Sequence, residues 1–318
     1  MGANTKHKKT KIKSVLVTGG TGFIGSHVVD YLRDKNIDVY ILARTKENFW
    51  RSDAHFVWGD IRDRSLVLEL LTKVDGVIHL AGRLGTAETI NNPIPSVEVN
   101  ILGSLNVFDG LRENNIPAVY IAVGNYWMNN SYSITKTTAE RFALMYNKEH
   151  NTQITVIRAL NAFGERQKHH PVKKIIPTFI LQALKNEPIS IYGNGKQKMD
   201  MIYVKDLVRI ICDALLKKHN VHDSVIEAGT GKGLTVNTVA KEVIRATHSK
   251  SIIQHGSMRP GEPKNAVVVA DIKTLRPLYP NGVRFTPFKE GLRETVAWYK
   301  KKSVMRICDF LSRDTKGL

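Results

Sequence analysis

The sequence has few cysteines and no long hydrophobic run. Only Cys212 and Cys308 occur among 318 residues, far apart in helix-like segments. We therefore expect free thiols in a reducing compartment, with no disulfide framework and no metal site. No stretch approaches the roughly 18 uninterrupted apolar residues of a membrane helix, which excludes a transmembrane protein. The lysine-rich residues 1–13 contain no small-residue cleavage site, so we expect a cytoplasmic protein without a secretory signal.

Acidic residues are scarce relative to basic ones, with 29 Asp and Glu against 47 Lys and Arg, for a net charge of +18. Residues 1–13 carry +5 and residues 300–318 carry +4, which predicts solvated basic tails at 1–11 and 311–318. The remaining excess favours an anionic small molecule over a nucleic-acid partner. A further basic cluster either lines a phosphate-binding cleft or forms a solvated loop; it consists of Arg166, Lys168, His169, His170, Lys173 and Lys174.

A glycine-rich turn follows the first strand-like run, Ser14–Thr18, and precedes an apolar-periodic stretch and a second strand-like run at Asp38–Ala43. Glycines permit the tight turn, a close approach of the backbone to a pyrophosphate, and close packing of helix on strand. The N-terminus of the helix offers free N–H groups to the phosphates. This order predicts a dinucleotide-binding βαβ unit, whose expected cofactor contacts are Gly19, Thr21, Gly22, Phe23, Ile24 and Gly25.

The second strand ends in Ala43-Arg44-Thr45, where dinucleotide-binding proteins that select NAD usually carry an acid. No carboxylate there opposes a 2′-phosphate, and Arg44 can pair with one. We therefore expect NAD(P), with NADP favoured. Arg44 can also stack on adenine or face solvent, so NAD remains the alternative.

Several motifs occur in a fixed order along the chain, and the glycine turn is the first of them. They are TGGTGFIG at 18–25, GDIRD at 59–63, HLAG at 79–82, VNILGSLNVFDGL at 99–111, YSITK at 132–136, IRALNAFG at 157–164, MIYVKDL at 201–207 and RPGEP at 259–263. Over residues 12–299 the chain resembles the extended short-chain dehydrogenases/reductases, in their NAD-dependent epimerase/dehydratase group acting on nucleotide sugars.

The resemblance implies an α/β fold, a Rossmann doubly wound parallel sheet with a smaller C-terminal substrate-binding domain. Residues 12–165 would form the NAD(P)-binding domain, to which a segment at about 196–222 returns, and residues 166–310 would mainly bind substrate. Asp60 would contact the adenine, Ala81 and Gly82 would border the nicotinamide ribose, and Asn100 would brace the central helix. Ile61 and Leu80 would belong to the same cofactor site.

The expected chemistry rests on Tyr132 and Lys136. A four-residue spacing on a helix places both side chains on one face. The ammonium of Lys136 would then favour the phenolate and lower the pKa of Tyr132. Tyr132 would take a proton from a sugar hydroxyl while a hydride passes to the nicotinamide.

Gly124 is a departure from the family, which places a Ser or Thr there to hydrogen-bond the reacting sugar oxygen. Asn125, Thr86 or a bound water could replace that donor. Family dehydratases and decarboxylases also carry carboxylates nearby, whereas residues 125–127 supply none. We therefore expect epimerisation, or one-way oxidation or reduction, at one carbon.

Substrate contacts follow from the resemblance alone. Asn161 and Arg259 would hold the diphosphate of a nucleotide sugar. Met199 stands where relatives commonly have a further arginine, and Lys198 or the basic cluster could replace that charge less directionally.

We therefore predict a nucleotide-sugar epimerase acting at hexose carbon 4. The alternatives are an NAD(P)-dependent 4-ketoreductase or dehydrogenase and, from another class, a catalytically impaired dinucleotide-binding regulator. Apolar stripes along helix-like residues 96–111 and 133–148, with surplus positions such as Leu144, predict a homodimer.

Overall fold

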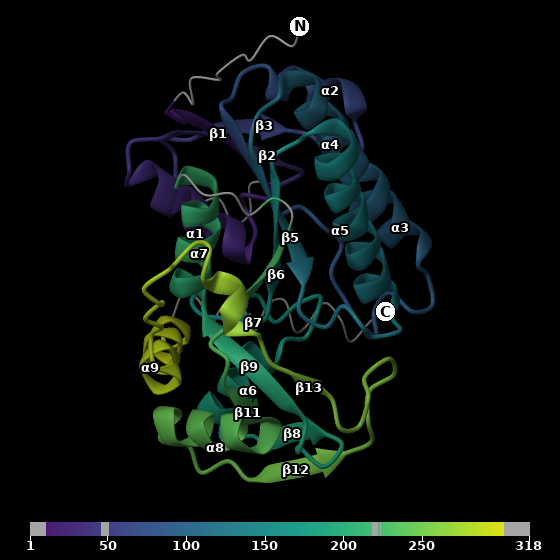
Figure 1. Cartoon of the computed structure of the whole chain (residues 1–318). Coiled ribbons are helices and arrows are strands. Elements are labelled where there is room, and N and C mark those ends of the chain that lie inside the picture. The colour runs from purple at the N-terminus through teal and green to yellow at the C-terminus, as the bar shows by residue number, and fades with distance from the viewer. Residues whose placement is uncertain (1–10, 46–50, 218–221, 223, 302–318) are drawn as a thin grey trace, which may run out of the picture.

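A seven-stranded parallel sheet forms the larger part of the molecule (Figure 1). The computed structural model describes residues 11–45, 51–217, 222 and 224–301. The strand order is β10-β6-β5-β4-β1-β2-β3. The strands are β1 (Ser14–Thr18), β2 (Asp38–Ala43), β3 (His55–Trp58), β4 (Gly76–His79), β5 (Ala118–Val123), β6 (Ile154–Ala159) and β10 (Val225–Ala228). The predicted doubly wound α/β fold is confirmed, because every pairing in this sheet is parallel.

Helices cover both faces of this sheet (Figure 1). The helices α1 (Phe23–Arg33) and α7 (Val204–Leu216) pack together on one face. The other face carries α2 (Arg64–Leu71), α4 (Gly103–Asn114) and α5 (Ser131–His150). Two separate hydrophobic cores result, one around Leu32 and Ile211 and the other around Leu70 and Phe108. Strands enclosed in this way have apolar side chains on both faces, as all six buried residues of β5 show.

The segment that returns to the large sheet comprises α7 and β10, because α7 contacts β4, β5 and β6, and β10 pairs with β6. It therefore begins and ends later than the predicted 196–222. Residues 198–203 instead form β9 (Lys198–Tyr203) of a smaller sheet with order β11-β9-β13, to which β7 (Asn161–Phe163) also pairs. Its other strands are β11 (Gly233–Thr235) and β13 (Val267–Val268).

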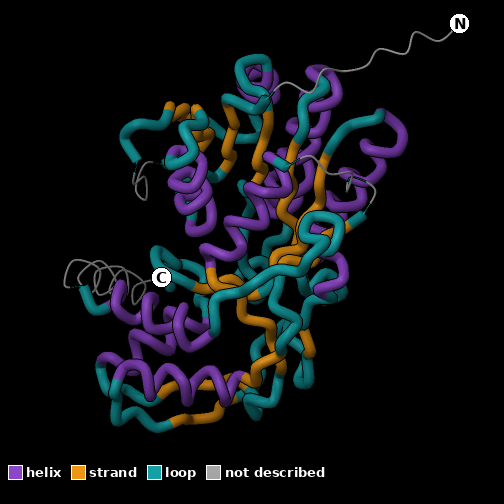
Figure 2. The backbone as a smooth tube through the Cα atoms, turned by 60° about the vertical axis from the view of Figure 1, so that its left-hand side comes forward, coloured by secondary structure: helices purple, strands orange, loops and turns teal. Residues whose placement is uncertain are grey.

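The smaller sheet lies below the large one in Figure 1, and Figure 2 shows the same division from another side. This lower part also contains the parallel pair β8 (Ile189–Tyr192) and β12 (Ile253–Gly256). Its helices are α6 (Ile175–Leu184), α8 (Val236–Thr247) and α9 (Phe288–Tyr299), with the 3₁₀ turn η2 (Ile272–Leu275) beside β10. Its core is continuous with the one on the α1 side of the large sheet.

The predicted helix over 96–111 is divided into three pieces: α3 (Ile94–Val97), the π-helical turn η1 (Glu98–Leu102) and α4. The predicted helix over 133–148 lies within α5. Leu144, expected as a surplus apolar position, packs partly buried against the core.

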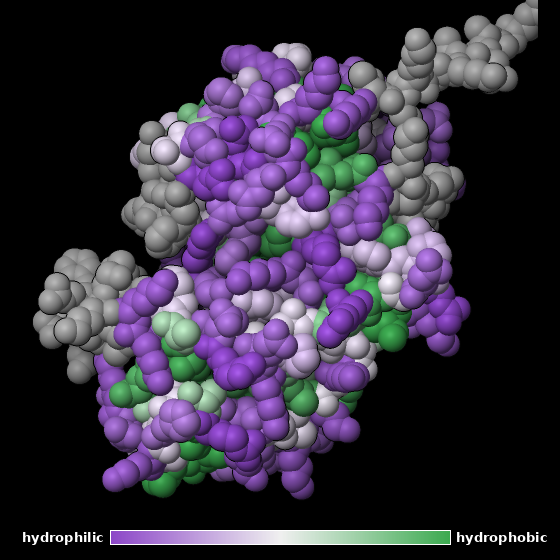
Figure 3. Space-filling view, turned by 90° about the vertical axis from the view of Figure 1, so that its left-hand side faces the viewer, coloured by the Kyte–Doolittle hydropathy of each residue, from purple (hydrophilic) through white to green (hydrophobic). Residues whose placement is uncertain are grey.

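Cys212 is a buried free thiol, whereas Cys308 and nearly all of both basic tails lie outside the described residues. No helix in the described parts of the chain is long and apolar enough to cross a membrane. The face turned to the viewer in Figure 3 is mainly hydrophilic, with smaller hydrophobic areas between.

Candidate active site

A cleft of about 1000 Å³ separates the two parts of the molecule. It lies at the carboxyl ends of β1, β2, β4 and β5, where open α/β sheets bind their ligands. Nearly all residues predicted for the site line it. They are Gly19, Thr21, Gly22, Phe23, Ile24, Gly25, Arg44, Asp60, Ile61, Leu80, Ala81, Gly82, Thr86, Asn125, Tyr132, Lys136, Asn161, Lys198 and Arg259.

The glycine turn at 19–25 leaves no space for side chains at two positions. Gly19 has φ +71°, which glycine adopts without strain, and its amide donates to the Leu42 carbonyl at 3.0 Å. A Cβ on Gly25 would lie 2.2 Å from the Gly19 carbonyl oxygen. Because Gly22 caps α1 without a side-chain hydrogen bond, the first N–H groups of the helix remain available to an anion in the cleft.

Arg44 projects from the end of β2, and its side chain is 70% exposed. Its nearest carboxylate is that of Asp60, 3.9 Å away. Asp60 itself is held by Arg62 at 3.0 Å. Although burial acts against ionisation, hydrogen bonds from the Arg62 side chain and backbone lower the pKa of Asp60. An anionic carboxylate and a largely exposed guanidinium thus lie together at the adenosine end expected for the cofactor.

A chain of buried hydrogen bonds joins β1 to α4 beneath the cleft. Ser104 donates to the Asn100 carbonyl at 2.7 Å, so its oxygen accepts from Nε2 of His79 at 3.0 Å. Nδ1 of His79 then accepts from the Thr18 hydroxyl at 2.6 Å, whose oxygen accepts from the Ala81 amide at 3.2 Å. Burial lowers the pKa of His79 to about 3, so the ring is neutral and suits this order.

Asn100 does not line the cleft, although the resemblance placed it among the cofactor residues. It is fully buried and connects the cleft wall with the helix of the expected catalytic pair. Its amide oxygen accepts from the Arg83 backbone at 2.7 Å, and its amide nitrogen donates to the Thr135 hydroxyl at 2.9 Å. Thr135 belongs to α5, between Tyr132 and Lys136.

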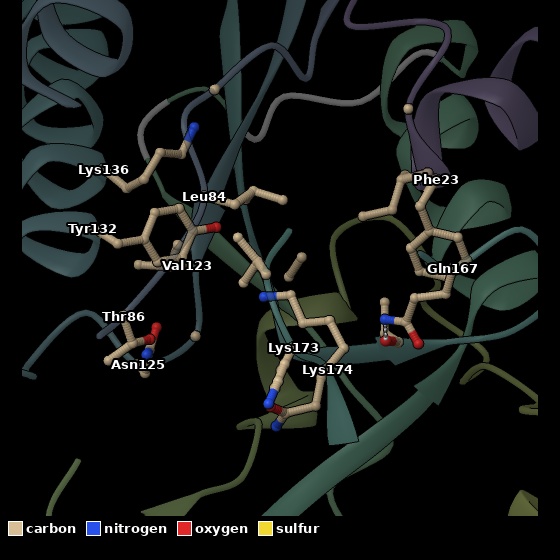
Figure 4. Close-up of a pocket in the computed structure, with 18 of the residues that line it drawn as sticks. Phe23, Leu84, Thr86, Val123, Asn125, Tyr132, Lys136, Gln167, Lys173 and Lys174 are labelled. Carbon is tan, nitrogen blue, oxygen red and sulfur yellow. Dashed lines mark hydrogen bonds between the residues drawn. The ribbon is translucent and has the colours of Figure 1, made fainter. Parts of the chain in front are cut away.

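Tyr132 and Lys136 lie one turn apart on α5 and point into the cleft in Figure 4. Asn130 begins this helix by accepting the Ser133 amide at 2.9 Å. Burial raises the pKa of Tyr132 to about 12, and burial, partly offset by Glu140, lowers the pKa of Lys136 to about 7. The prediction that Lys136 lowers the pKa of Tyr132 is therefore wrong for the protein alone, where burial of the phenol raises that pKa.

A buried ion pair supports the next turn of α5. Arg158 on β6 donates to Glu140 through two bonds of 2.6 and 3.0 Å. The guanidinium of Arg158 also stacks on the Tyr126 ring at 3.6 Å. The helix, strand β6 and the loop after β5 are thereby held together beside Tyr132.

The predicted replacements for a hydroxyl at position 124 lie on the Tyr132 side of the cleft in Figure 4. The Asn125 amide donates to Sδ of Met128 at 3.3 Å, and both Asn125 and Thr86 line the cleft. The presence of a glycine at position 124 is explained by its neighbour, because a Cβ there would lie 2.5 Å from Cδ1 of Leu160. The side chain of Leu160 occupies the space that a serine would need.

On the substrate side, the basic cluster divides. Lys173 and Lys174 line the cleft and appear inside it in Figure 4. Arg166 instead pairs with Asp30 on α1 at 2.8 Å, away from the cleft, and Lys168, His169 and His170 are not among the lining residues. Met199 does line the cleft, so the position without the family's arginine faces the ligand space.

Two lining carboxylates, Glu88 and Glu262, were missed by sequence reasoning. Both contact Arg259, at 3.2 and 3.5 Å. Glu262 belongs to the quoted RPGEP motif and could have been found there, whereas Glu88 lies in a loop without a motif. Among the described residues no cluster of His, Cys, Asp and Glu is arranged to hold a metal ion.

Comparisons with known proteins agree with this architecture. The sequence profile of the NAD dependent epimerase/dehydratase family matches residues 15–127 and 120–229. A putative UDP-glucose 4-epimerase of Methanocaldococcus jannaschii is 30% identical over 91% of this chain and 99% of its own length. A UDP-N-acetyl-alpha-D-glucosaminuronate decarboxylase of Bacillus cytotoxicus is 27% identical over 91% and 98%. The crystal structure of the Thermus thermophilus UDP-glucose 4-epimerase with NAD superposes with a TM-score of 0.82 at 25% identity, covering 91% of this chain and 99% of that one.

Proposed function

The chain belongs to the NAD dependent epimerase/dehydratase family and is an NAD(P)-dependent sugar-nucleotide enzyme; on this basis we propose that it is a nucleotide-sugar 4-epimerase with Tyr132 and Lys136 as its catalytic pair. The observation that carries the proposal is the cleft, where these two side chains face a glycine-turn dinucleotide site and where, among the described residues, the lining carboxylates Glu88 and Glu262 are bound to Arg259.

The glycine turn fits a dinucleotide. Gly19 and Gly25 keep side chains out of the turn, and the uncapped start of α1 would receive the pyrophosphate. The nicotinamide would accept a hydride from the sugar carbon and return it. The solved relative that holds NAD supports NAD as the cofactor over the NADP preference expected from Arg44. Mass spectrometry of the dinucleotide released from purified protein decides between the two.

Tyr132 and Lys136 would handle the proton. With a pKa raised to about 12, Tyr132 is protonated in the protein alone, and a protonated phenol does not take up a further proton. The positive charge of an oxidised nicotinamide, together with the charged form of Lys136, would bring the phenolate within reach. Tyr132 would accept the proton of the sugar 4-hydroxyl as the hydride leaves and return it afterwards.

Decarboxylation and dehydration need a further acid or base near the sugar. The carboxylates lining the cleft within the described residues are Asp60, Glu88 and Glu262. Asp60 lies at the adenosine end beside Arg62, and the other two are bound to Arg259. The likeness to a decarboxylase therefore supports the fold and the nucleotide-sugar class, while the cleft favours simple hydride and proton transfer.

One experiment separates the candidates. Purified protein is incubated with UDP-glucose and other nucleotide sugars without added cofactor, and products are separated by chromatography while absorbance at 340 nm is followed. A 4-epimerase interconverts the C4 epimers with no net absorbance change, and Tyr132→Phe reduces turnover by about 10² or more. A net change at 340 nm that requires added NAD(P) would instead identify a ketoreductase or dehydrogenase. Dinucleotide binding without any turnover would identify a regulator.

A further inference from the structure

An ion pair bridges the substrate end of the cleft. Glu88 belongs to the loop after β4, and Arg259 to the loop after β12. The Arg259 guanidinium donates to Oε1 of Glu88 at 3.2 Å, and the two side chains are 19% and 31% exposed. An acid of the larger part of the molecule thus already holds the arginine that the family resemblance assigns to the substrate diphosphate.

Two more charged groups complete this cluster. Glu262 lies 3.5 Å from Arg259, and burial raises the pKa of Glu262. Lys174 lies at the start of α6, where Glu88, Glu262 and Arg259 all act on its charge and burial lowers its pKa. With both carboxylates ionised and both bases protonated, the four charges cancel. Glu88 and Glu262 thereby offset the positive charge of Arg259 and Lys174, while Lys173 and Lys198, which also line the cleft, keep the substrate end attractive to an anion.

The loop of Glu88 also contacts the start of the catalytic helix. Gly261, two residues after Arg259, has φ +76°, and a Cβ there would lie 3.1 Å from Ile90 and 3.5 Å from both Thr86 and Asn130. The Ser131 hydroxyl donates to the Thr89 carbonyl at 3.0 Å. Because Ser131 precedes Tyr132, the substrate-side loop, the Glu88 loop and the helix that carries Tyr132 form one contact chain.

We propose that Glu88 is a built-in competitor of the substrate phosphate: its carboxylate holds Arg259 across the cleft in the free enzyme and is displaced when the nucleotide diphosphate binds. This rests on the proposed nucleotide-sugar function and on the contact between Arg259 and the diphosphate that the family resemblance implies. Glu88 is the carboxylate that leaves, because Glu262 lies in the same turn as Arg259, with the Glu262 amide bonded to the Arg259 carbonyl at 3.3 Å. Substrate binding thereby exchanges one anion for another on Arg259 and releases the loop that contacts the start of α5.

The test measures binding of uridine diphosphate to the full chain by titration calorimetry, so it needs no turnover. Glu88→Gln keeps the size of the side chain and removes the competing charge, and we expect UDP to bind about three- to tenfold more tightly. In an Arg259→Gln background the same change should not tighten UDP binding, because no guanidinium remains for which Glu88 and the phosphate compete. Glu113→Gln on the distant helix α4, where Glu113 pairs with Arg64 at 3.6 Å, is the matched control and should leave UDP affinity unchanged.

Unchanged or weaker UDP binding by Glu88→Gln, or a gain that persists in the Arg259→Gln background, would overturn the proposal. Unfolding midpoints show whether each variant is folded. If Glu88→Gln does not fold, Glu88→Asp retains the charge on a shorter side chain and should give a smaller gain, and weaker binding by this variant would equally overturn the proposal. Failure of the proposed function would appear separately, as absent epimerisation in every variant and in the wild type.

Discussion

At Gly124 the backbone leaves no room for the hydroxyl that the family places there. A Cβ would lie 2.5 Å from Cδ1 of Leu160 and 3.3 Å from the Ala159 carbonyl. We predict that Gly124→Ser lowers the free energy of unfolding by about 1–3 kcal/mol, the usual cost of overpacking a core. Urea denaturation followed by circular dichroism measures this loss.

The collision with Leu160 can be isolated with a double-mutant cycle. Leu160→Ala removes the obstructing atoms at its own cost, so in that background Gly124→Ser should cost at least about 1 kcal/mol less than in the wild type. Strictly additive losses would show that Leu160 is not the reason for the glycine.

Lys136 makes stability depend on pH in a definite direction. Burial lowers its pKa from 10.5 to about 7, so between pH 7 and 10.5 the unfolded chain holds a proton that the folded protein lacks. The stability of the cofactor-free enzyme should therefore rise with pH, by about 2 kcal/mol from roughly pH 7 to pH 9 through this group alone. Denaturant titrations at both pH values should show the rise in the wild type, and Lys136→Met should lack that part of it. An equal dependence of stability on pH in the wild type and in Lys136→Met would rule out a pKa of Lys136 lowered to about 7.

Individual residues were predictable from sequence where a motif ties chemistry to backbone geometry. Tyr132, Lys136, Gly19, Gly22 and Gly25 all line the cleft for this reason. Glu88 and Leu160 were not predictable, because their effects arise only when distant segments meet. The pKa of Tyr132 was predicted in the wrong direction, because burial depends on packing that helical spacing does not reveal.

At the scale of elements, Asp200 fixes β9 to the loops around it. Its fully buried carboxylate accepts hydrogen bonds from the Thr230 amide and hydroxyl at 2.9 and 2.6 Å, from the Gly231 amide at 2.8 Å and from the Ala270 amide at 3.2 Å. We predict that Asp200→Ala destabilises the protein by about 3 kcal/mol or more, because it leaves several buried donors without an acceptor.

Thermal unfolding measures this loss, and Asp38→Ala is the control. Asp38 is an exposed aspartate on β2 with one ion pair to Arg33, and its removal should cost less than about 1 kcal/mol. Similar losses of stability for the two variants would show that the hydrogen bonds of Asp200 do not hold β9 in place.

The hydrogen bonds of Asp200 also explain why the sequence predicted the large sheet better than the small one. Strands β1 and β2 have the bounds that their apolar runs predict, since most of their side chains are buried. Residues 198–203 were expected to return to the domain of the large sheet, but the Asp200 carboxylate cannot enter an apolar core without hydrogen-bond donors for its lone pairs. It finds four donors, the Thr230 hydroxyl and the backbone amides of Thr230, Gly231 and Ala270. Such long-range pairing leaves no periodic signal.

For the whole molecule, the surface of α3, η1 and α5 predicts self-association. Ile94, Leu102, Ile134 and Met145 are large apolar side chains exposed on these elements, and α3 and η1 both pack against α5. Neighbouring exposed apolar residues on paired helices are typical of an isologous helical interface. The surplus positions that support a homodimer are therefore these four and not Leu144. Light scattering coupled to size exclusion should give twice the mass of the 35.7 kDa chain.

The combined substitutions Leu102→Glu and Met145→Glu should convert such a dimer to monomers at micromolar concentration, because charges would be buried unpaired at the contact and weaken it by about a hundredfold or more. Ile252→Glu is the control, since Ile252 is also exposed but directly precedes β12, in the lower part of the molecule in Figure 1. It should leave the mass unchanged. Because η1 leads into α4 and α5 carries Tyr132, loss of the interface would also loosen the elements that hold Tyr132 and Lys136. The monomeric variant should therefore lose thermal stability and turnover together, whereas a monomeric wild type would place these apolar residues outside any subunit contact.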